Sequence, residues 1–233
     1  MPLRSGRASR RHGSLPLRCV HATSPGNILL ATLAYWTSAA AVLVVGGWMV
    51  CPFGACAMTT LDRAGLEFAQ GWRTPALDAV MHAITWGGSL WLLLPLTALA
   101  LLWLTARGYA RPGVFLTVSL LGASVVSHLA KLALARPRPD LFPPDFPLPL
   151  DWSYPSAHTM QAFALAVAIL LLTRGRTRAL AATLLIGALL VGFSRIFLQV
   201  HYPSDVIAGM LAAGLWVAGL HHWMFRRHAH PPA

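Results

Sequence analysis

Three short stretches of this chain carry residue types that could perform chemistry together. They are KLALARPRP (Lys131–Pro139), YPSAH (Tyr154–His158) and SRIFLQVHYPSD (Ser194–Asp205), and each lies beside a long apolar run. Ionisable groups next to membrane-length apolar segments are costly unless they have a partner or a function. Together the stretches supply several basic groups, two histidines and one acid, which suit anion binding combined with acid–base or nucleophilic chemistry.

The first stretch places a lysine near the end of an apolar run and two arginines among prolines. Prolines stop a helix and stiffen the chain that leaves it, so Lys131 and Arg138 can turn toward one point. Basic groups beside a low-dielectric interior form a strong anion site. The alternative is that each side chain extends separately to the membrane surface, as lone lysines and arginines commonly do.

The second stretch opens another apolar run. Ser156 is a natural N-cap, and the unpaired N–H groups at such a helix start, together with the helix dipole, favour an anion. His158 lies in the first turn and faces the same space. The alternative is an ordinary cap with an incidental histidine at the membrane surface.

The third stretch repeats this arrangement, because Pro203 suits a first helical turn and Asp205 follows just inside it. His201 and Asp205 are four residues apart, so the carboxylate can reach the imidazole and fix its tautomer. The other ring nitrogen is then available as a nucleophile or base. Favourable placement near the helix dipole would explain Asp205 alone, but not Arg195 and His201 beside it.

This inventory favours phosphoryl transfer through a covalent phosphohistidine. Such a reaction asks the protein mainly to position the phosphate and to neutralise its charge, which guanidinium and ammonium groups can do where other enzymes use Mg²⁺. The sequence has no carboxylate cluster that would hold a divalent cation, and the neighbouring Lys and Arg side chains would repel a zinc ion from the histidines. We therefore expect no metal and no cofactor.

The composition indicates an integral membrane protein. Of the 233 residues 56% are hydrophobic and 11% are charged, with a mean hydropathy of +0.60, whereas a soluble domain has about 25% charged residues. The formal net charge of +11 does not indicate nucleic-acid binding, because the arginines are scattered among apolar segments and no basic stripe with aromatics is present. Residues 60–87 have helical periodicity broken by charges and Pro75, which predicts one or two short helices on the membrane surface.

The predicted fold class is all-α, a bundle of six transmembrane helices with that short interfacial segment between the first and second spans. The expected spans are about 28–50, 88–106, 113–133, 157–173, 179–198 and 203–225. The first is read as a retained anchor, since its apolar run exceeds the core of a signal peptide.

The basic residues orient these spans. With the N-terminus inside, twelve of the eighteen Lys and Arg residues fall on the cytoplasmic side, as the positive-inside rule requires. All seven acids and the three stretches then fall on the outer side. Cys51 and Cys56, just past the first span, either form a small disulfide loop on that side or stay unpaired.

The three stretches resemble the three-part signature of the type 2 phosphatidic acid phosphatase superfamily, which also includes the vanadium haloperoxidases. That signature reads Lys-x6-Arg-Pro, Pro-Ser-Gly-His and Ser-Arg-x5-His-x3-Asp. The matching residues, in order and with the same internal spacings, are Lys131, Arg138 and Pro139, then Pro155, Ser156 and His158, then Ser194, Arg195, His201 and Asp205. Residues 1–130 carry only the general membrane pattern.

The resemblance implies a role for each matching residue. His201 would attack phosphorus, Asp205 would hold His201, and His158 would protonate the leaving oxygen and then help to activate water. The phosphate oxygens would be bound by Lys131, Arg138, Arg195, Ser156 and the backbone N–H of Ala157. Ala157 departs from the family's usual glycine, and we expect it to be tolerated because the position begins a helix, where φ is negative.

The resulting hypothesis is a metal-independent phosphatase of the bacterial-type inner membrane, with its active site on the periplasmic face. Its domains would be a disordered cytoplasmic tail (1–26), a single membrane phosphatase domain (27–227) and a second cytoplasmic tail (228–233). Candidate substrates are a polyprenyl diphosphate, phosphatidylglycerol phosphate, phosphatidic acid and a lipid A phosphate. A lipid-phosphate-binding or transport protein that uses the same basic groups without chemistry is the alternative, and a haloperoxidase is disfavoured by the apolar spans. The sequence leaves the substrate and the oligomeric state open.

Overall fold

The structure, a computed structural model, describes residues 25–142, 149–174 and 178–226. Within these ranges the chain forms helices and connecting turns, with no strand. The long helices are α1 (Pro25–Val50), α4 (Leu90–Ala106), α5 (Ala110–Leu134), α6 (Ala157–Thr173), α7 (Arg178–Phe197) and α8 (Pro203–Arg226). Between α1 and α4 lie the shorter helices η1 (Pro52–Gly54), α2 (Thr60–Gly71), α3 (Pro75–Thr85) and η2 (Trp86–Gly88). The all-α prediction is thus confirmed for the described residues.

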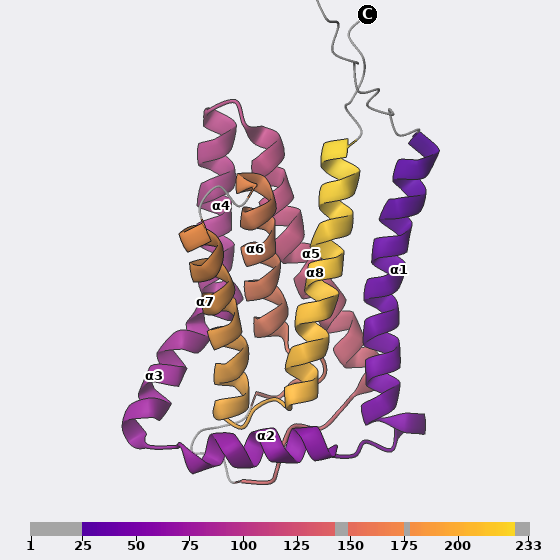
Figure 1. The fold of residues 1–233 in the computed structure, drawn as a ribbon. Coiled ribbons are helices and arrows are strands. Elements are labelled where there is room, and N and C mark those ends of the chain that lie inside the picture. The colour runs from indigo at the N-terminus through magenta and orange to yellow at the C-terminus, as the bar shows by residue number, and fades with distance from the viewer. Residues whose placement is uncertain (1–24, 143–148, 175–177, 227–233) are drawn as a thin grey trace, which may run out of the picture.

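The long helices stand side by side in one bundle and alternate in direction along the chain, while α2 lies across one end (Figure 1). At that end α1, α5 and α7 finish and α4, α6 and α8 begin. We call it the α2 end. Helix α6 occupies the middle of the bundle, where it packs against α5, α7 and α8.

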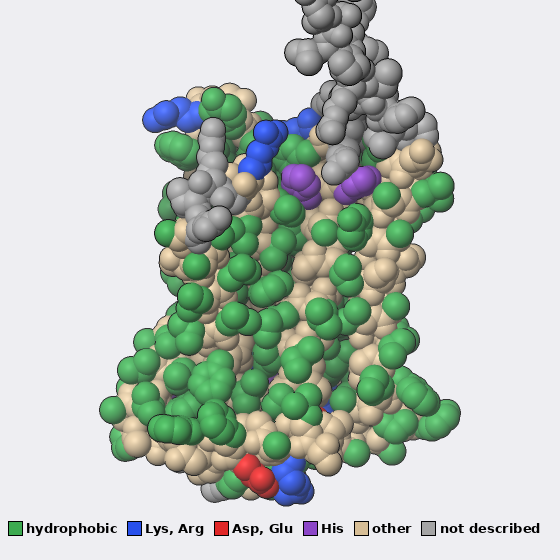
Figure 2. Space-filling model, in the orientation of Figure 1, with side chains coloured by type: hydrophobic (Ala, Val, Ile, Leu, Met, Phe, Trp, Pro, Cys, Tyr) green, Lys and Arg blue, Asp and Glu red, His purple; other side chains and the backbone are tan. Residues whose placement is uncertain are grey.

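The predicted spans coincide with helices to within about three residues. By length and hydropathy, four helices can cross a membrane: α1, α5, α7 and α8. Helix α3 with η2 joins α4 at a bend of 41°, and this pair qualifies as a fifth candidate span. Helix α6, with 17 residues, is a shorter apolar helix. On the face shown in Figure 2, hydrophobic side chains cover much of the side of the bundle, and the charged side chains and histidines lie near its two ends.

Residues 60–87 form the two helices α2 and α3, in agreement with the prediction of one or two short helices. The end of α1 is linked to α2 by a short loop in which Cys51 and Cys56 form a disulfide, so the paired alternative is the one present. Helix α2 starts with a capping box, in which the Thr59 hydroxyl accepts from the Asp62 N–H and the Asp62 carboxylate accepts from the Thr59 N–H. This box satisfies two N–H groups at the helix start.

Two glycines allow the short helices to approach the bundle closely. A Cβ on Gly65 of α2 would lie 2.4 Å from the Pro203 ring at the start of α8. A Cβ on Gly88 of η2 would lie 2.6 Å from the backbone oxygen of His158, in the first turn of α6. Any larger residue at these positions would push α2 or η2 away from the helix starts that carry the predicted chemistry.

The two tails predicted from sequence, 1–26 and 228–233, lie outside the described residues except for Pro25 and Gly26, which begin α1. The first span therefore starts three residues earlier than expected.

Candidate active site

A cavity of about 220 Å³ at the α2 end collects side chains from all three predicted stretches. Six of the predicted site residues line it, namely Lys131, Arg138, Ala157, His158, Arg195 and His201. The remaining wall is formed by Ser89, Leu90, Trp91, Pro149, Asp151 and Gln161. Lys131 and His201, which are 70 positions apart in sequence, thus line the same small cavity. The sequence predicted that the three stretches lie at the same face of the membrane, which is consistent with this meeting.

Local sequence explains how these residues reach the cavity. Helix α5 ends at Ala135 in the left-handed conformation, and Pro137 and Pro139 prevent the helix from resuming. Helix α8 starts at Pro203, whose missing N–H costs nothing in the first turn. The cavity is therefore built from helix ends, where the backbone can change direction and polar groups are unpaired.

His201 is completely enclosed and is oriented by an acid. Its Nδ1 lies 3.4 Å from Oδ2 of Asp205 and 3.4 Å from the Ser153 hydroxyl. Its Nε2 lies 3.3 Å from an Nη of Arg138. A guanidinium can only donate, so Nε2 carries the lone pair and Nδ1 carries the proton directed at Asp205. This tautomer leaves the lone pair of Nε2 facing Arg138, which also lines the cavity.

The surroundings of His201 also keep its ring neutral. Burial lowers the pKa of His201 well below its ordinary value, and the positive charges of Arg138, Lys131 and Arg195 lower it further. A neutral imidazole is the form that can act as a nucleophile, so burial and charge favour the same state of the ring.

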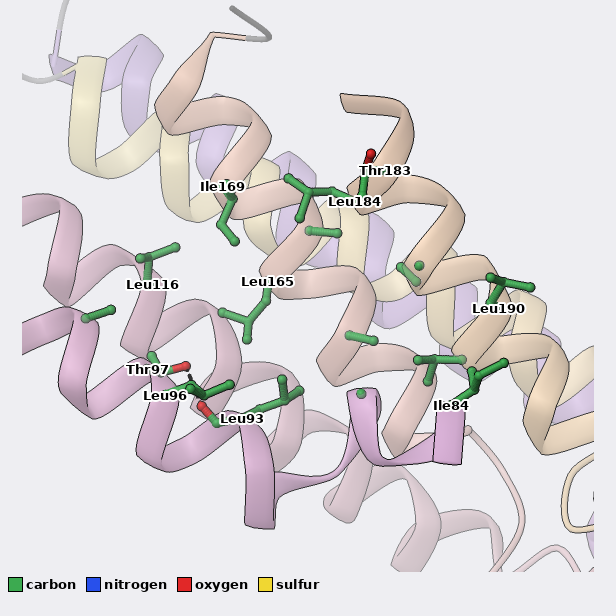
Figure 3. A pocket seen from close by; sticks show the side chains of 17 residues that line it. Ile84, Leu93, Leu96, Thr97, Leu116, Leu165, Ile169, Thr183, Leu184 and Leu190 are labelled. Carbon is green, nitrogen blue, oxygen red and sulfur yellow. Dashed lines mark hydrogen bonds between the residues drawn. The ribbon is translucent and has the colours of Figure 1, made fainter. Parts of the chain in front are cut away.

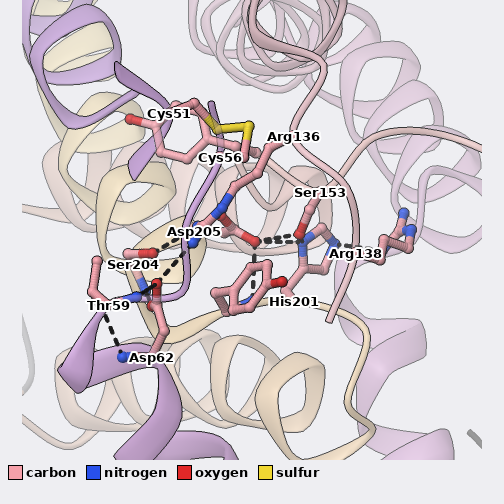
Figure 4. Close-up of polar contacts among 12 residues, drawn as sticks. Cys51, Cys56, Thr59, Asp62, Arg136, Arg138, Ser153, His201, Ser204 and Asp205 are labelled. Atoms are coloured by element: carbon pink, nitrogen blue, oxygen red, sulfur yellow. Dashed lines mark hydrogen bonds and ion pairs between the residues drawn. A yellow bond between two sulfur atoms is a disulfide. The ribbon is translucent and has the colours of Figure 1, made fainter. Parts of the chain in front are cut away.

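Asp205 is the centre of a buried network that includes a residue the sequence analysis passed over (Figure 4). The Arg136 guanidinium donates from Nη1 to Asp205 Oδ1 (2.6 Å) and from Nη2 to Asp62 Oδ2 (2.8 Å). The Asp205 carboxylate also accepts from the Ser153 hydroxyl and from the Tyr202 N–H (3.0 Å), and Asp62 accepts from the Ser204 N–H (3.0 Å). Arg136, Asp62 and Asp205 are at most 1% exposed.

The network joins α2 to the catalytic candidates. The Arg136 guanidinium stacks over the Tyr202 ring at 3.8 Å, and the Gln199 side chain donates to the Leu66 carbonyl of α2 (3.0 Å). Arg136 is one of the six residues between Lys131 and Arg138, and the Lys-x6-Arg-Pro signature does not specify any of these six residues. Its proximity to a proline and to a second arginine was the only signal in the sequence.

A second polar layer lies on the cavity side of this network. Lys131 and Arg138 both form ion pairs with Asp151, which the sequence analysis did not include among the site residues. Arg138 donates in addition to the Val200 carbonyl (2.6 Å) beside His201. The two basic groups of the first stretch thus point to one place, as predicted.

Arg195 reaches the cavity from the last turn of α7. Its Nη1 donates to the Thr85 hydroxyl of α3 (2.6 Å), which positions the guanidinium. Its Nε is buried and has no hydrogen-bond partner among the described residues. A buried, unpaired cationic donor at a cavity wall is costly, so this atom is suited to an anion.

The second stretch is only partly placed as expected. Ala157 lines the cavity, and it is not among the non-glycine residues with positive φ, so the backbone at this position does not require a glycine. His158, in the first turn of α6, also lines the cavity. Ser156, however, is fully buried outside the cavity wall. Its hydroxyl accepts from Thr159 (2.9 Å) and makes no capping bond to the helix, so its predicted contact with an anion has no direct support in this geometry.

Two apolar grooves lie within the bundle, and one of them shares part of its wall with the polar cavity. One, of about 530 Å³, lies between α3, α4, α6 and α7 and is lined largely by aliphatic side chains such as Leu93, Leu165 and Leu184 (Figure 3). The other, of about 440 Å³, runs along α5 and shares Leu90, Lys131, Asp151, Ala157 and Gln161 with the polar cavity. A molecule with an anionic head in the cavity could therefore extend an apolar part into a groove.

Among the described residues no group of three His, Cys, Asp or Glu side chains is arranged to hold a metal ion. Three cationic side chains, those of Lys131, Arg138 and Arg195, line the cavity, which suits an anionic ligand.

The chain was compared with known proteins. The model of the PAP2 superfamily matches residues 112–229. An undecaprenyl-diphosphatase of Sulfolobus acidocaldarius is 34% identical over 148 residues, which is 62% of this chain and 68% of that protein. A lipid A 1-phosphatase of Rhizobium johnstonii is 36% identical over 126 residues, 49% of this chain and 48% of that protein. Among solved structures, a transmembrane PAP2-type phosphatidylglycerolphosphate phosphatase from Bacillus subtilis has a TM-score of 0.62 at 24% identity, covering 83% of this chain and 93% of that one. The last likeness supports the fold.

The buried network yields a prediction about stability. In Arg136→Met the carboxylates of Asp62 and Asp205 lose their shared cation inside the protein, and breaking such a buried pair costs about 3–5 kcal/mol. We expect a large drop in the thermal unfolding midpoint of the protein purified in detergent. The matched control is Arg63→Met, because the exposed Arg63–Glu67 pair on α2 contributes about 0–1 kcal/mol. Equal midpoints for the two variants would contradict the importance of the network.

Proposed function

This chain belongs to the PAP2 superfamily, and we propose that it is an integral membrane lipid phosphatase that hydrolyses a phosphomonoester or diphosphate head group through a phosphohistidine. The observation that carries the proposal is the convergence of Lys131, Arg138, Arg195, His158 and His201 on one cavity, with Asp205 directly behind His201. A protein that only binds or transports a lipid phosphate needs the cationic groups, but it does not need a histidine that is oriented by a buried acid.

In the first step the phosphate oxygens are bound by Lys131, Arg138, Arg195 and the Ala157 N–H, whereas Ser156, buried against Thr159, takes no direct part. The Nε2 lone pair of His201 attacks phosphorus, and the bond from phosphorus to the leaving oxygen breaks. His158 donates its proton to that oxygen, so the dephosphorylated lipid leaves neutral at this position. Asp205 balances the positive charge that develops on the His201 ring.

In the second step water replaces the lipid. His158, now neutral, accepts a proton from the water as its oxygen attacks phosphorus, and the bond from phosphorus to Nε2 breaks. Inorganic phosphate is released, His201 is neutral again, and His158 carries the proton needed for the next cycle. The cationic side chains neutralise the charge on the phosphoryl oxygens throughout, so the mechanism that we propose uses no metal ion.

We further propose that α1, α4, α5, α6, α7 and α8 all cross the membrane, with α3 bent against α4 and α2 lying at the surface. The six spans would form a single phosphatase domain over 27–227. Helix α6 is about 26 Å long at 1.5 Å per residue, somewhat less than a hydrocarbon core of about 30 Å. Its sides pack against α5, α7 and α8, so much of its surface faces protein instead of lipid and a match to the full hydrocarbon thickness is not required.

The positive-inside rule supports an orientation with both termini in the cytoplasm and the α2 end on the periplasmic face of an inner membrane. The α4–α5 turn carries Arg107 and Arg111 at the opposite end from α2, on the side that we assign to the cytoplasm.

This orientation is testable by a reporter fused after Ala233. A fluorescent protein that matures only in the cytoplasm should be bright, and an alkaline phosphatase fusion at the same site should be inactive. A fusion in the turn between α2 and α3 should give the reverse pattern. An active alkaline phosphatase after Ala233 would overturn the orientation.

The substrate is the part of the proposal on which the relatives differ. One relative is an undecaprenyl-diphosphatase and another a lipid A 1-phosphatase. The candidates for this chain are a polyprenyl diphosphate, a lipid A phosphate, phosphatidylglycerol phosphate and phosphatidic acid. Phosphate release from each of these in matched detergent micelles, compared as kcat/KM, would rank them.

The mechanism predicts the behaviour of two histidine variants. His201→Ala removes the nucleophile and should abolish phosphate release and the acid-labile phosphoenzyme. His158→Ala removes the proton donor and should lower kcat by about 10²–10⁴-fold, which is the usual contribution of a general acid. His222→Ala, at the far end of α8, is the control and should retain activity. All three variants are assayed beside the wild type in excess chelator. Full activity in His201→Ala would refute the mechanism, and so would loss of wild-type activity when chelator is added.

The charge around His201 predicts how its ring titrates. The pKa of His201 is lowered by burial and by neighbouring cations. The ring should therefore remain neutral well below the ordinary histidine pKa of about 6.5. In Lys131→Met one cation is removed, protonation of the ring becomes easier, and its pKa should rise. NMR titration of ¹⁵N-histidine-labelled protein, assigned with His201→Asn, measures both values. An ordinary wild-type pKa, or a lower pKa in Lys131→Met, would contradict this account.

A further inference from the structure

Asp151 has contacts that the proposed mechanism does not explain. It lies six residues before the start of α6, its side chain is 51% exposed, and it lines the polar cavity. It is the only acid among the described residues of the cavity wall. An acid in a cavity that should bind phosphate is unexpected, because a like charge weakens the binding of an anion.

The carboxylate of Asp151 is bound by the two basic groups of the first stretch. Its Oδ2 lies 3.0 Å from Lys131 Nζ, and its Oδ1 accepts from Arg138 Nη2. Arg138 Nε also donates to the Asp151 carbonyl (3.0 Å), and Lys131 donates to the Trp152 carbonyl. One short segment thus engages two of the three cations that the proposed function assigns to the phosphate.

Partial burial raises the pKa of Asp151, but Lys131 and then Arg138 outweigh burial and lower the pKa to about 2. At neutral pH the side chain is therefore an anion within the cationic cavity.

This anion fills the cationic site incompletely. A carboxylate has two oxygens in a plane, and here both are taken up by Lys131 and Arg138. The Nε of Arg195 stays without a partner, although it is buried. A tetrahedral phosphate has more oxygens and more charge, so it can bind the groups that hold Asp151 and also the donor that Asp151 leaves unpaired.

We propose that Asp151 is an internal counter-anion, which occupies part of the phosphate site in the free enzyme and is displaced by the phosphate of the substrate. This inference rests on the proposed function for the identity of the anion. The half-exposed position of Asp151 allows the displaced side chain to move into water, where its charge is solvated.

The displacement gives Asp151 a role in turnover. Three cations around a small cavity beside an apolar interior would retain inorganic phosphate after the second step. A carboxylate held on the same chain competes with that phosphate at a high effective concentration, so it weakens product binding and speeds product release. The substrate loses the same amount of affinity, but it has a lipid chain that an apolar groove can bind and that the product phosphate lacks.

A static role makes the opposite prediction. If Asp151 only holds Lys131 and Arg138 in position and stays bound beside the phosphate, its removal releases both cations from their arrangement. Anion binding would then become weaker or stay unchanged. The sign of the change in phosphate affinity therefore distinguishes the two roles.

The test is calorimetric titration of inorganic phosphate into the full-length protein in detergent, with no lipid substrate present. We expect Asp151→Asn to bind phosphate on the order of tenfold more tightly than the wild type, which corresponds to about 1.4 kcal/mol. Asp151→Ser should behave in the same way, and Asp151→Glu, which keeps the charge, should stay near the wild type. The matched control is Asp140→Asn, because Asp140 is exposed, lies close in sequence to Arg138 and is not part of the cavity wall.

Unchanged or weaker phosphate binding in folded Asp151→Asn and Asp151→Ser would overturn the inference, as would an equal gain in Asp140→Asn. The thermal unfolding midpoint of each variant identifies those that are folded. Phosphate release from lipids is measured separately. If no lipid phosphate is hydrolysed but both neutral variants bind phosphate more tightly, the proposed function fails and the counter-anion stands. If lipids are hydrolysed and the affinity does not rise, the reverse holds.

Discussion

The arrangement of the α2 end depends on one guanidinium that is bound by two buried carboxylates. Arg136 is 1% exposed and pairs with Asp62 and Asp205, which are both fully buried. A charge so far from water is stable only if its partners and hydrogen bonds replace the lost solvation. Two acids and one cation leave an excess negative charge, and it is stabilised by the Ser153 hydroxyl and by the N–H groups of Tyr202 and Ser204. This excess lies next to His201, where it can balance a positive charge on the ring.

The same guanidinium links the position of α2 to the orientation of His201. Asp62 belongs to the first turn of α2 and Asp205 to the first turn of α8. If α2 moved away, Arg136 would lose its ion pair with Asp62. The guanidinium would then be held only from the side of Asp205, and its orientation toward Asp205 would be less fixed. A helix that lies across the bundle end and has no side chain in the cavity thus contributes to the geometry of His201.

The sequence predicts the parts of this structure that depend on local patterns. Apolar runs place the long helices to within a few residues, because the length of an apolar segment and its breakers are read directly from the chain. The spacing from His201 to Asp205 predicts their contact, although His201 lies two residues before α8 and the contact is made across the start of that helix. Arg136, Asp62, Ser153 and Asp151 were missed for a common reason. Arg136 pairs across 69 and 74 positions, and no periodicity records a contact between residues that far apart. Ser156 shows the converse, since its capping position was correct but its hydroxyl binds Thr159 instead of facing the cavity.

Asp205 and Asp151 both lie near His201, but their surroundings differ. The difference allows Asp205 to orient the histidine while Asp151 binds the cations of the cavity. Asp205 is fully buried and accepts bonds from several fixed donors, so leaving its place would expose a charge to an interior that cannot solvate it. Asp151 is half-exposed, so the same charge can leave toward water at a much smaller cost. Lys131 and Arg138 bind the mobile acid, whereas Arg136, two residues before Arg138, binds the fixed one. Anions can therefore exchange in the cavity while the acid that orients the histidine keeps its position, because the cations that hold the two acids are different side chains.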